Sequence, residues 1–164
     1  MKKIPLNKQF PWLTKIPQGS HGSTIVFKKL WKVISDYVRI RDFVAYKRCI
    51  SCSKAISRWE EWQAGHYVAF SVCRGWSKYD MDNIFGQCSY CNTGYNANVT
   101  AHQFRETIKS RYGQERLDYL DSFPKMPLEK LNEYEACIRM ENILKEISKL
   151  KYKPSYFTKI KSYF

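Results

Sequence analysis

Three stretches of the chain carry apolar residues at intervals of three and four, a spacing that places them on one face of an α-helix. The stretches are residues 25–46, 100–112 and 127–150. Thr100 and Gln103 have the spacing of a capping box at the start of the second helix, and Gly113 is expected to end that helix. A short helix over residues 114–121 is predicted to follow.

Between the first two helices the pattern changes to short β-prone runs. Residues 66–70 and 83–85 are such runs, and the segment between them contains Gly75, Asp80 and Asp82, which favour turns. We therefore predict a β-hairpin with a long connection. Together with the helices, this hairpin predicts an α+β fold.

The two ends of the chain differ from its centre. Residues 1–24 have no sustained period and are interrupted by three prolines, so they predict a basic extended arm. Residues 25–123 form the predicted central domain, which includes the first helix. Residues 124–150 hold the long helix, and residues 151–164 form a basic aromatic tail.

The charge of the chain is concentrated at these ends. The 28 Lys and Arg exceed the 15 Asp and Glu by 13, and residues 1–48 contribute +9 of this surplus and residues 151–164 the remaining +4. A neutral body with two basic ends predicts a polyanionic partner, for which nucleic acid fits better than a phospholipid surface. We find neither a secretion signal nor a membrane span, and therefore expect a cytoplasmic protein without a membrane partner.

Four of the six cysteines form two pairs of identical spacing. Cys49 and Cys52 make one Cys-X-X-Cys pair, and Cys88 and Cys91 make the other. Each pair can place two thiolates on one tetrahedral ion, so the four predict a structural zinc site with an inserted element between the pairs. The alternative is four reduced structural cysteines. Cys73 and Cys137 stand alone and are interpreted as small buried hydrophobic residues.

Three further residues lie in the order of an HNH motif with asparagine at the third position: His66, Asn83 and Asn92. The sequences around them are Ala-Gly-His66-Tyr and Asp-Asn83-Ile-Phe-Gly-Gln-Cys-Ser-Tyr-Cys91-Asn92, followed later by Arg111-Tyr-Gly-Gln-Glu-Arg. Over residues 30–121 the chain resembles the phage Rap/NinG recombination endonucleases. Asn92, directly after the last cysteine, is also similar in position to its counterpart in phage endonuclease VII, a zinc-stapled nuclease.

Both resemblances imply the same core, a zinc-stapled ββα-metal fold of the HNH or His-Me finger type with flanking α-helices. They imply that His66 ends the first strand, Asn83 steadies the loop between the strands, and Asn92 begins the helix that presents a catalytic metal. The implied activity is cleavage of branched DNA such as Holliday junctions and D-loops. A phage origin would place the protein in the host cytoplasm.

Phosphodiester hydrolysis needs a base for the attacking water and stabilisation of the leaving oxygen. Histidine, with an ordinary pKa of about 6.5, suits the base, and we expect His66 in this role. A Mg²⁺ or Mn²⁺ ion on Asn92 would stabilise the leaving 3′ oxygen, so that the products carry 5′-phosphate and 3′-hydroxyl ends.

The second ligand of this catalytic ion is open, because endonuclease VII has an acid directly before the histidine where this chain has Gly65. Asn96, four residues after Asn92, would share its helical face and is the expected ligand. The weaker candidates are Asn98, His102, Asp82 and Glu61.

DNA is expected to be held by basic residues in two groups. One group, on the exposed side of the first helix, is Lys28, Lys29, Lys32 and Arg39, and the other, in the tail, is Lys151, Lys153, Lys159 and Lys161. The tail aromatics could stack on unpaired bases or dock on the protein's own core. Because a resolvase cuts two strands symmetrically, we expect a homodimer with the helix of residues 127–150 as its interface.

A rival function is a zinc-stapled DNA-binding module without catalysis, in which the missing acid at Gly65 has abolished the catalytic metal site. An RNA-processing nuclease is a third, weaker possibility. Each candidate residue also has a plain structural reading: His66 as a bonded strand histidine, Asn83 as a turn residue, and Asn92 as a helix cap.

Overall fold

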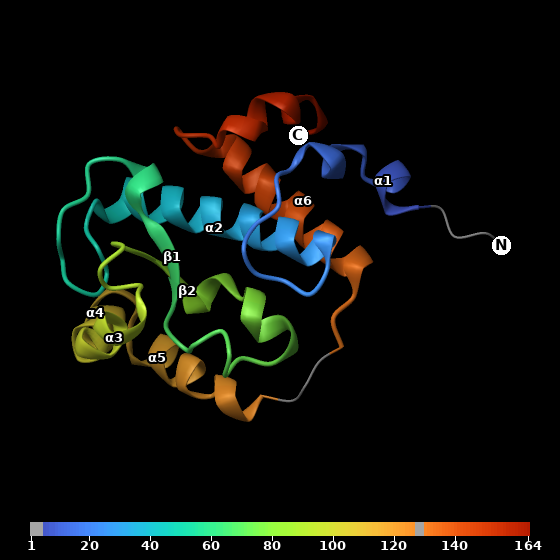
Figure 1. The fold of residues 1–164 in the computed structure, drawn as a ribbon. Coiled ribbons are helices and arrows are strands. Elements are labelled where there is room, and N and C mark those ends of the chain that lie inside the picture. The colour runs from blue at the N-terminus through green and yellow to red at the C-terminus, as the bar shows by residue number, and fades with distance from the viewer. Residues whose placement is uncertain (1–4, 127–129) are drawn as a thin grey trace. The chain divides into compact units, whose positions relative to one another are not determined.

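The computed structural model describes residues 5–126 and 130–164 (Figure 1). The chain divides into two compact units. Residues 38–130 form one, here called the hairpin unit, and residues 1–37 with 131–164 form the other, here called the terminal unit. The helices are α1 (Leu6–Gln9), α2 (Ile25–Tyr46), α3 (Gly94–Val99), α4 (Ala101–Tyr112), α5 (Gln114–Asp121) and α6 (Glu133–Lys149). The strands are β1 (Gln63–His66) and β2 (Ile84–Gln87), so the fold is α+β and mostly helical.

Helix α2 has the bounds predicted from its apolar spacing, Ile25–Tyr46. Most of its apolar residues are buried, among them Leu30, Val33, Ile34, Val38 and Ile40, whereas Ile25 and Val44 near its ends are exposed. Burying a side chain of this size contributes about 1.5–3 kcal/mol, which explains why the spacing alone located the helix. No helix in the described ranges 5–126 and 130–164 is both long and apolar enough to cross a membrane.

The hairpin of the hairpin unit is short. Strand β1 pairs antiparallel with β2, with Gln63 opposite Gln87 and His66 opposite Ile84 (Figure 1). The β-prone run was placed too late in the chain, since β1 ends at His66 instead of beginning there, which is the strand end that the family resemblance implied. The pairing stops because Val68 N–H donates to the side-chain Oδ1 of Asn83 (2.8 Å) instead of to a strand partner.

Helices α3, α4 and α5 follow one another after Cys91. Helix α4 and helix α5 have the bounds predicted from the sequence, and Gly113 between them adopts φ of +88°, a conformation that favours glycine. The capping box predicted at Thr100 does not form, because the Thr100 side chain makes no cap hydrogen bond. Helix α3 ends immediately before Thr100, whose hydroxyl instead donates to the carbonyl of Asn96 (3.0 Å).

Helices α4 and α5 pack on the hairpin through one apolar cluster. Its buried members are Ile50, Cys73, Phe85, Phe104, Ile108, Leu117, Leu120 and Phe123. Phe85 of β2 meets Phe104 of α4 edge to face, with ring centroids 5.5 Å apart. Phe85 therefore links the sheet to the helices, and Cys73 is a buried apolar residue as predicted.

The start of the terminal unit differs from the extended arm that we predicted. Residues 6–9 form helix α1, and Pro11–Lys15 form a 3₁₀ helix. Phe10, Trp12 and Ile16 are buried. The prolines begin and punctuate short helical turns, and the aromatic residues between them provide the packing that the missing period concealed.

Helix α6 is shorter than predicted. It begins at Glu133, where the side chain of Asn132 accepts from the N–H groups of Tyr134 (2.8 Å) and Glu135 (3.3 Å). The predicted start, Pro127, lies outside the described residues. The apolar face of α6 is mostly buried within the chain, which leaves Tyr134 and Ile138 as its exposed large apolar residues.

The C-terminal tail is also folded rather than free. Tyr156, Phe157 and Ile160 are buried, and the ring of Phe164 lies 5.9 Å from that of Trp12. Of the two readings of the tail, the structure supports docking on the protein's own core for these aromatics. Their rings are therefore not available for stacking on bases.

Candidate metal centre and hydrolytic site

The four paired cysteines meet at the base of the hairpin. Cys49 and Cys52 lie before β1, and Cys88 and Cys91 lie after β2. Their sulfur atoms all lie within 4.8 Å of one another, and the Sγ atoms of Cys52 and Cys88 are 3.7 Å apart. A tetrahedral Zn²⁺ with Zn–S bonds of about 2.3 Å places sulfurs about 3.8 Å apart. The cluster therefore fits a zinc ion, as the spacing predicted.

The backbone around the cysteines is arranged for thiolate ligands. Cys88 N–H points at the Sγ of Cys49 (3.3 Å), and Ser53 N–H closes a tight turn on the carbonyl of Cys49 (2.9 Å). Burial raises the pKa of the Cys49 thiol, although backbone N–H donors act in the opposite direction. Because a buried thiolate is unfavourable by itself, a bound cation would be needed to hold the cluster deprotonated.

His66 stands at the end of β1, where two contacts hold its ring. Its Nε2 lies 2.9 Å from the carbonyl of Lys78, and its ring meets that of Phe70 edge to face at 5.4 Å. A carbonyl oxygen can only accept, so Nε2 carries the proton of this hydrogen bond. In the neutral imidazole, Nδ1 is then the basic nitrogen.

Asn83 fastens the backbone that follows His66. Its fully buried side chain accepts from Val68 N–H (2.8 Å) and donates to Val68 O (3.0 Å), while its own carbonyl accepts from Tyr67 N–H (2.9 Å). These two hydrogen bonds from one side chain to the backbone of Val68 fix the path of the chain after β1. The role in the site that the family resemblance implied for Asn83 stays a prediction.

Asn92 lies beside β1, but not at the start of a helix. The expectation that it begins the helix was wrong, because α3 begins at Gly94 after Thr93. The side-chain Nδ2 of Asn92 donates to Oε1 of Gln63 on β1 (2.8 Å), and its backbone N–H donates to the carbonyl of Cys88 (3.2 Å). The cysteine turn therefore positions Asn92 against the strand that carries His66.

Gly65 explains why the acid of the endonuclease VII pattern is absent. A Cβ built on Gly65 would lie 1.6 Å from Oε1 of Gln87 and 2.5 Å from Oδ1 of Asn92. Any side chain at this position would have to displace both amides. Sequence reasoning assigned no role to Gln63 or to Gln87, although Gln87 lies within the quoted motif, and the signal was a glycine where the endonuclease VII pattern has an acid.

The other predicted ligands lie elsewhere. Asn96 is within α3, where its amide donates to the hydroxyl of Thr93 (3.4 Å). Asp82 forms an ion pair with Arg116 (2.5 Å). The remaining weaker candidates, Glu61, Asn98 and His102, have exposed side chains.

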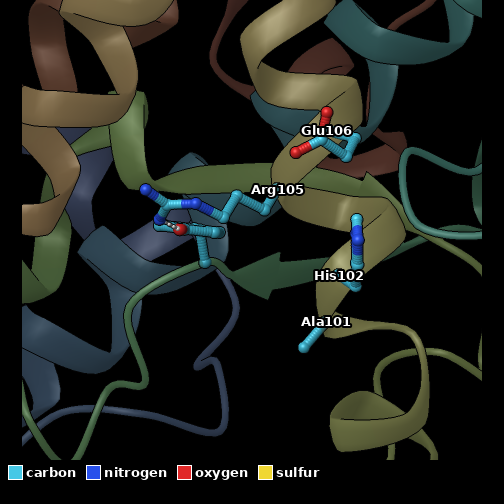
Figure 2. A pocket seen from close by; sticks show the side chains of 5 residues that line it. Ala101, His102, Arg105 and Glu106 are labelled. Carbon is cyan, nitrogen blue, oxygen red and sulfur yellow. Dashed lines mark hydrogen bonds between the residues drawn. The ribbon is translucent and has the colours of Figure 1, made fainter.

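His102 lines an open pocket of about 520 Å³ on α4, together with Ala101, Arg105, Glu106 and Tyr67 (Figure 2). Nη1 of Arg105 donates to the hydroxyl of Tyr67, the residue after His66 (2.6 Å). Arg105 also forms a bidentate pair with Asp121 (2.9 and 2.8 Å), and this hydrogen bonding holds the pKa of the Asp121 carboxyl below its ordinary value. Arg105, which lines the pocket, is therefore held in place by its ion pair with Asp121.

The basic residues predicted for DNA divide into two kinds. On α2, Lys28, Lys29, Lys32 and Arg39 are half-buried rather than exposed. Lys29 Nζ donates to the carbonyl of Leu13 (2.6 Å), Lys32 pairs with the buried Asp36 (2.5 Å), and Arg39 donates to the carbonyl of Trp62 (3.3 Å). The expected exposed face of α2 is therefore wrong. In the tail, Lys151, Lys159 and Lys161 are exposed and Lys153 is half-buried.

These features define a class of protein: an α+β chain whose two-stranded hairpin is closed at its base by a four-cysteine cluster suited to zinc. The model of one family, described as bacteriophage lambda NinG protein, matches residues 22–152. The chain belongs to this NinG family, which confirms that part of the resemblance read from the sequence. No curated protein matches the chain, and no solved structure does.

Proposed function

We propose that this protein is a metal-dependent endonuclease that hydrolyses phosphodiester bonds in branched DNA recombination intermediates. The observation that carries this proposal is the pairing of two side chains on one strand: His66 ends β1, and Gln63 at the other end of β1 holds Asn92. The proposed proton acceptor, His66, and the proposed oxygen ligand of a divalent cation, Asn92, are thus both attached to strand β1. Their attachment to one short strand supports an HNH-type reaction at this end of the hairpin.

In this mechanism His66 takes the proton of the attacking water at Nδ1. The bond from Nε2 to the carbonyl of Lys78 supports this assignment, because it fixes the tautomer and the ring orientation before the substrate arrives. It also allows the ring to become an imidazolium without losing that hydrogen bond. General-base assistance of this kind contributes typically about 10²–10⁴ in rate.

The residues near Asn92 fit an oxygen-ligated divalent cation such as Mg²⁺ or Mn²⁺, since amide oxygens are suitable ligands and Mg²⁺ needs few from the protein. When bound, such a cation would stabilise the leaving 3′ oxygen, which gives 5′-phosphate and 3′-hydroxyl products. Gln63 keeps Asn92 in place through its 2.8 Å hydrogen bond. Asn83 keeps the chain after His66 from moving into the site.

The substrate class rests on the family and on charge. The NinG family is described from a bacteriophage protein. The resemblance of this chain to phage recombination endonucleases points to Holliday junctions and D-loops as substrates. The net charge of +13 supports a nucleic-acid partner, and the exposed tail lysines are the group still available for phosphates. None of the described side chains forms an evident base-reading surface, so selectivity for DNA structure fits better than selectivity for sequence.

The rival function is a zinc-dependent DNA-binding module without catalysis. The specific observation in its favour is Gly65, which leaves the predicted cation site without a carboxylate. Such a module would need zinc to fold but would be indifferent to Mg²⁺. The nuclease would require Mg²⁺ or Mn²⁺ for turnover.

The test is cleavage of a labelled four-way junction and a matched linear duplex by the zinc-loaded protein with Mg²⁺ or Mn²⁺. We expect wild type to cut the junction preferentially, and His66→Ala to bind it but to cut about 10²–10⁴-fold more slowly. His21→Ala, which alters an exposed histidine of the terminal unit, is the matched control and should cut like wild type. Tight binding without cleavage of either DNA would favour the rival.

A resolvase needs two cuts, so the proposal includes a homodimer. Helix α6 offers Tyr134 and Ile138 as exposed apolar residues, while the rest of its apolar face is buried. Sedimentation of the protein with and without junction DNA tests this part separately. A monomer in both conditions would leave the nuclease proposal intact but would exclude symmetric cleavage by one assembled dimer.

A further inference from the structure

The space above Gly65 is shaped by two amide oxygens. Gln87 approaches from β2 and Asn92 from the turn after the last cysteine, and a Cβ on Gly65 would lie 1.6 Å and 2.5 Å from their side-chain oxygens. The two oxygens are therefore at most 4.1 Å apart, which is the sum of these distances. Ligands of one Mg²⁺ ion, at about 2.0–2.1 Å each, are separated by at most about 4.2 Å.

Hydrogen bonds fix which atom of each amide faces this space. Nε2 of Gln87 donates to the hydroxyl of Ser51 (2.6 Å), and Nδ2 of Asn92 donates to Oε1 of Gln63 (2.8 Å). With both nitrogens engaged, both oxygens turn toward Gly65. In the described part of the chain, no hydrogen-bond donor is assigned to either oxygen.

Gln87 is the more informative of the two residues, because it is only 3% exposed. Its side-chain oxygen is not among the fully buried polar atoms that lack a partner, so this oxygen keeps contact with solvent and a cation can reach it. Two converging oxygens without donors repel each other, and a cation between them removes this repulsion. Glycine at position 65 is what allows the approach, since any other residue would fill the space.

We propose that Oε1 of Gln87 and Oδ1 of Asn92 together bind a divalent cation above Gly65, so that Gln87 is the second protein ligand. This inference rests on the proposed function for the role of Asn92 and adds the residue that compensates for the missing acid. It assigns to Gln87 the position that helical spacing had suggested for Asn96. Ser51 and Gln63 are positioning residues, since each holds the nitrogen of one ligating amide.

The chemistry of this ligand pair has a consequence for affinity. Both ligands are neutral, so the protein alone offers no negative charge to the cation, and DNA phosphates must supply it. A carboxylate in place of the Gln87 amide would keep an oxygen at the same position and add that charge. Gln87→Glu is therefore expected to bind Mn²⁺ more tightly than wild type in the absence of DNA.

The experiment measures Mn²⁺ binding to the full-length, zinc-loaded protein without DNA, by the EPR signal of free Mn²⁺ and by calorimetry. We expect Gln87→Ala to weaken binding by more than about tenfold, and Ser51→Ala and Gln63→Ala to weaken it by about tenfold, as loss of an outer-shell partner does. Gly65→Ala should abolish it. Gln103→Ala, on the exposed side of α4, is the matched control.

Zinc content and circular dichroism show which variants fold, and Gln87→Glu keeps the test decisive if Gln87→Ala does not. The proposal is overturned if wild type binds no Mn²⁺ at millimolar concentration, or if Gln87→Ala and Gln87→Glu bind it as wild type does. Junction cleavage by the same proteins separates the two proposals. Mn²⁺ binding through Gln87 without any cleavage would refute the nuclease but support the ligand assignment. Cleavage by the Gln87 variants at the wild-type rate would support the nuclease but refute the ligand assignment.

Discussion

The hairpin unit and the terminal unit use their polar residues in different ways. In the hairpin unit, single polar side chains hold backbone in place: Asn83 clamps Val68, and the carboxylate of Asp42 accepts from Gly86 N–H (2.6 Å). The terminal unit holds 14 basic and 5 acidic residues and packs through aromatic rings such as Phe10 against Trp12 and Trp12 against Phe164.

This comparison shows that the unit with most of the net charge is not the unit that contains the candidate site. The hairpin unit has 14 basic and 10 acidic residues, so it carries less of the net charge, yet it contains the cysteine cluster and every candidate catalytic residue. Half of the basic residues proposed for DNA turn out to be half-buried on α2. Charge therefore points to the class of partner, and only hydrogen-bonded geometry points to the chemistry.

The largest expected effect is removal of zinc. A structural zinc contributes about 10–16 kcal/mol of apparent binding free energy, so chelation should unfold the hairpin unit. We expect amides of β1 and β2 to lose protection in hydrogen exchange while amides of α6 keep theirs. The matched control is Cys137→Ala, which alters a buried cysteine of α6 outside the cluster and should leave the zinc content at one per chain. Equal loss of protection in α6 would show that the two units are not separable.

The next largest effect compares two asparagines. Asn83→Ala removes three hydrogen bonds of a fully buried amide, two to Val68 and one to the sulfur of Cys73, and should lower the free energy of unfolding by about 2–4 kcal/mol. Asn132→Ala removes the N-cap of α6 at an exposed position and should cost about 1 kcal/mol. Urea denaturation of the zinc-loaded proteins measures both. Similar costs would mean that the loop after His66 is not specially fixed.

A third pair of variants tests the two kinds of lysine. Lys32→Ala removes the ion pair of the buried Asp36 and should lower stability by about 1–3 kcal/mol. Lys159→Ala and Lys161→Ala alter exposed residues and should leave stability unchanged, while each reduces the salt dependence of DNA binding by about 0.9 in slope. Junction binding measured from 50 to 200 mM salt, with thermal denaturation alongside, distinguishes them. If Lys32→Ala kept full stability but reduced the salt dependence of DNA binding, α2 would belong to the DNA-binding surface after all.

The smallest effect concerns the exposed pair of Arg105 and Asp121. Because the folded-state pKa of Asp121 is lowered, the pair stabilises the fold above the ordinary Asp pKa of 3.8 and loses this contribution as pH falls through the lowered value. Solvent screening limits the contribution to under about 1 kcal/mol. An NMR titration of the Asp121 carboxyl should show it still mostly ionised at pH 3.8. In Arg105→Ala its pKa should return toward 3.8.

Much of the fold could be predicted because it is local. The bounds of α2, α4 and α5 follow from apolar spacing and from Gly113, and none of these depends on a distant partner. The predictions for the terminal unit were less accurate. Residues 5–24 lack a period but become ordered through contacts between aromatic rings far apart in the chain, such as Trp12 and Phe164. Those contacts leave no periodic trace in the sequence.

The same division holds for the candidate site. The cysteine spacing determined the metal cluster, because Cys-X-X-Cys can bring two sulfurs to one ion wherever it occurs. The order of His66, Asn83 and Asn92 indicated the nuclease class, but the tautomer of His66 depends on the carbonyl of Lys78, twelve residues away. The choice between Asn96 and Gln87 likewise depends on β2 lying beside β1.

The sequence by itself thus determined helices α2, α4 and α5, the cysteine cluster, the excess of positive charge and the family of this protein. These properties are encoded in residues near one another or in simple sums over the chain. Only the tertiary structure decided which lysines are exposed, how the two ends of the chain pack, and which oxygens converge above Gly65. Each of these depends on distances between residues remote in sequence, and such distances are set by packing and strand pairing rather than by local pattern.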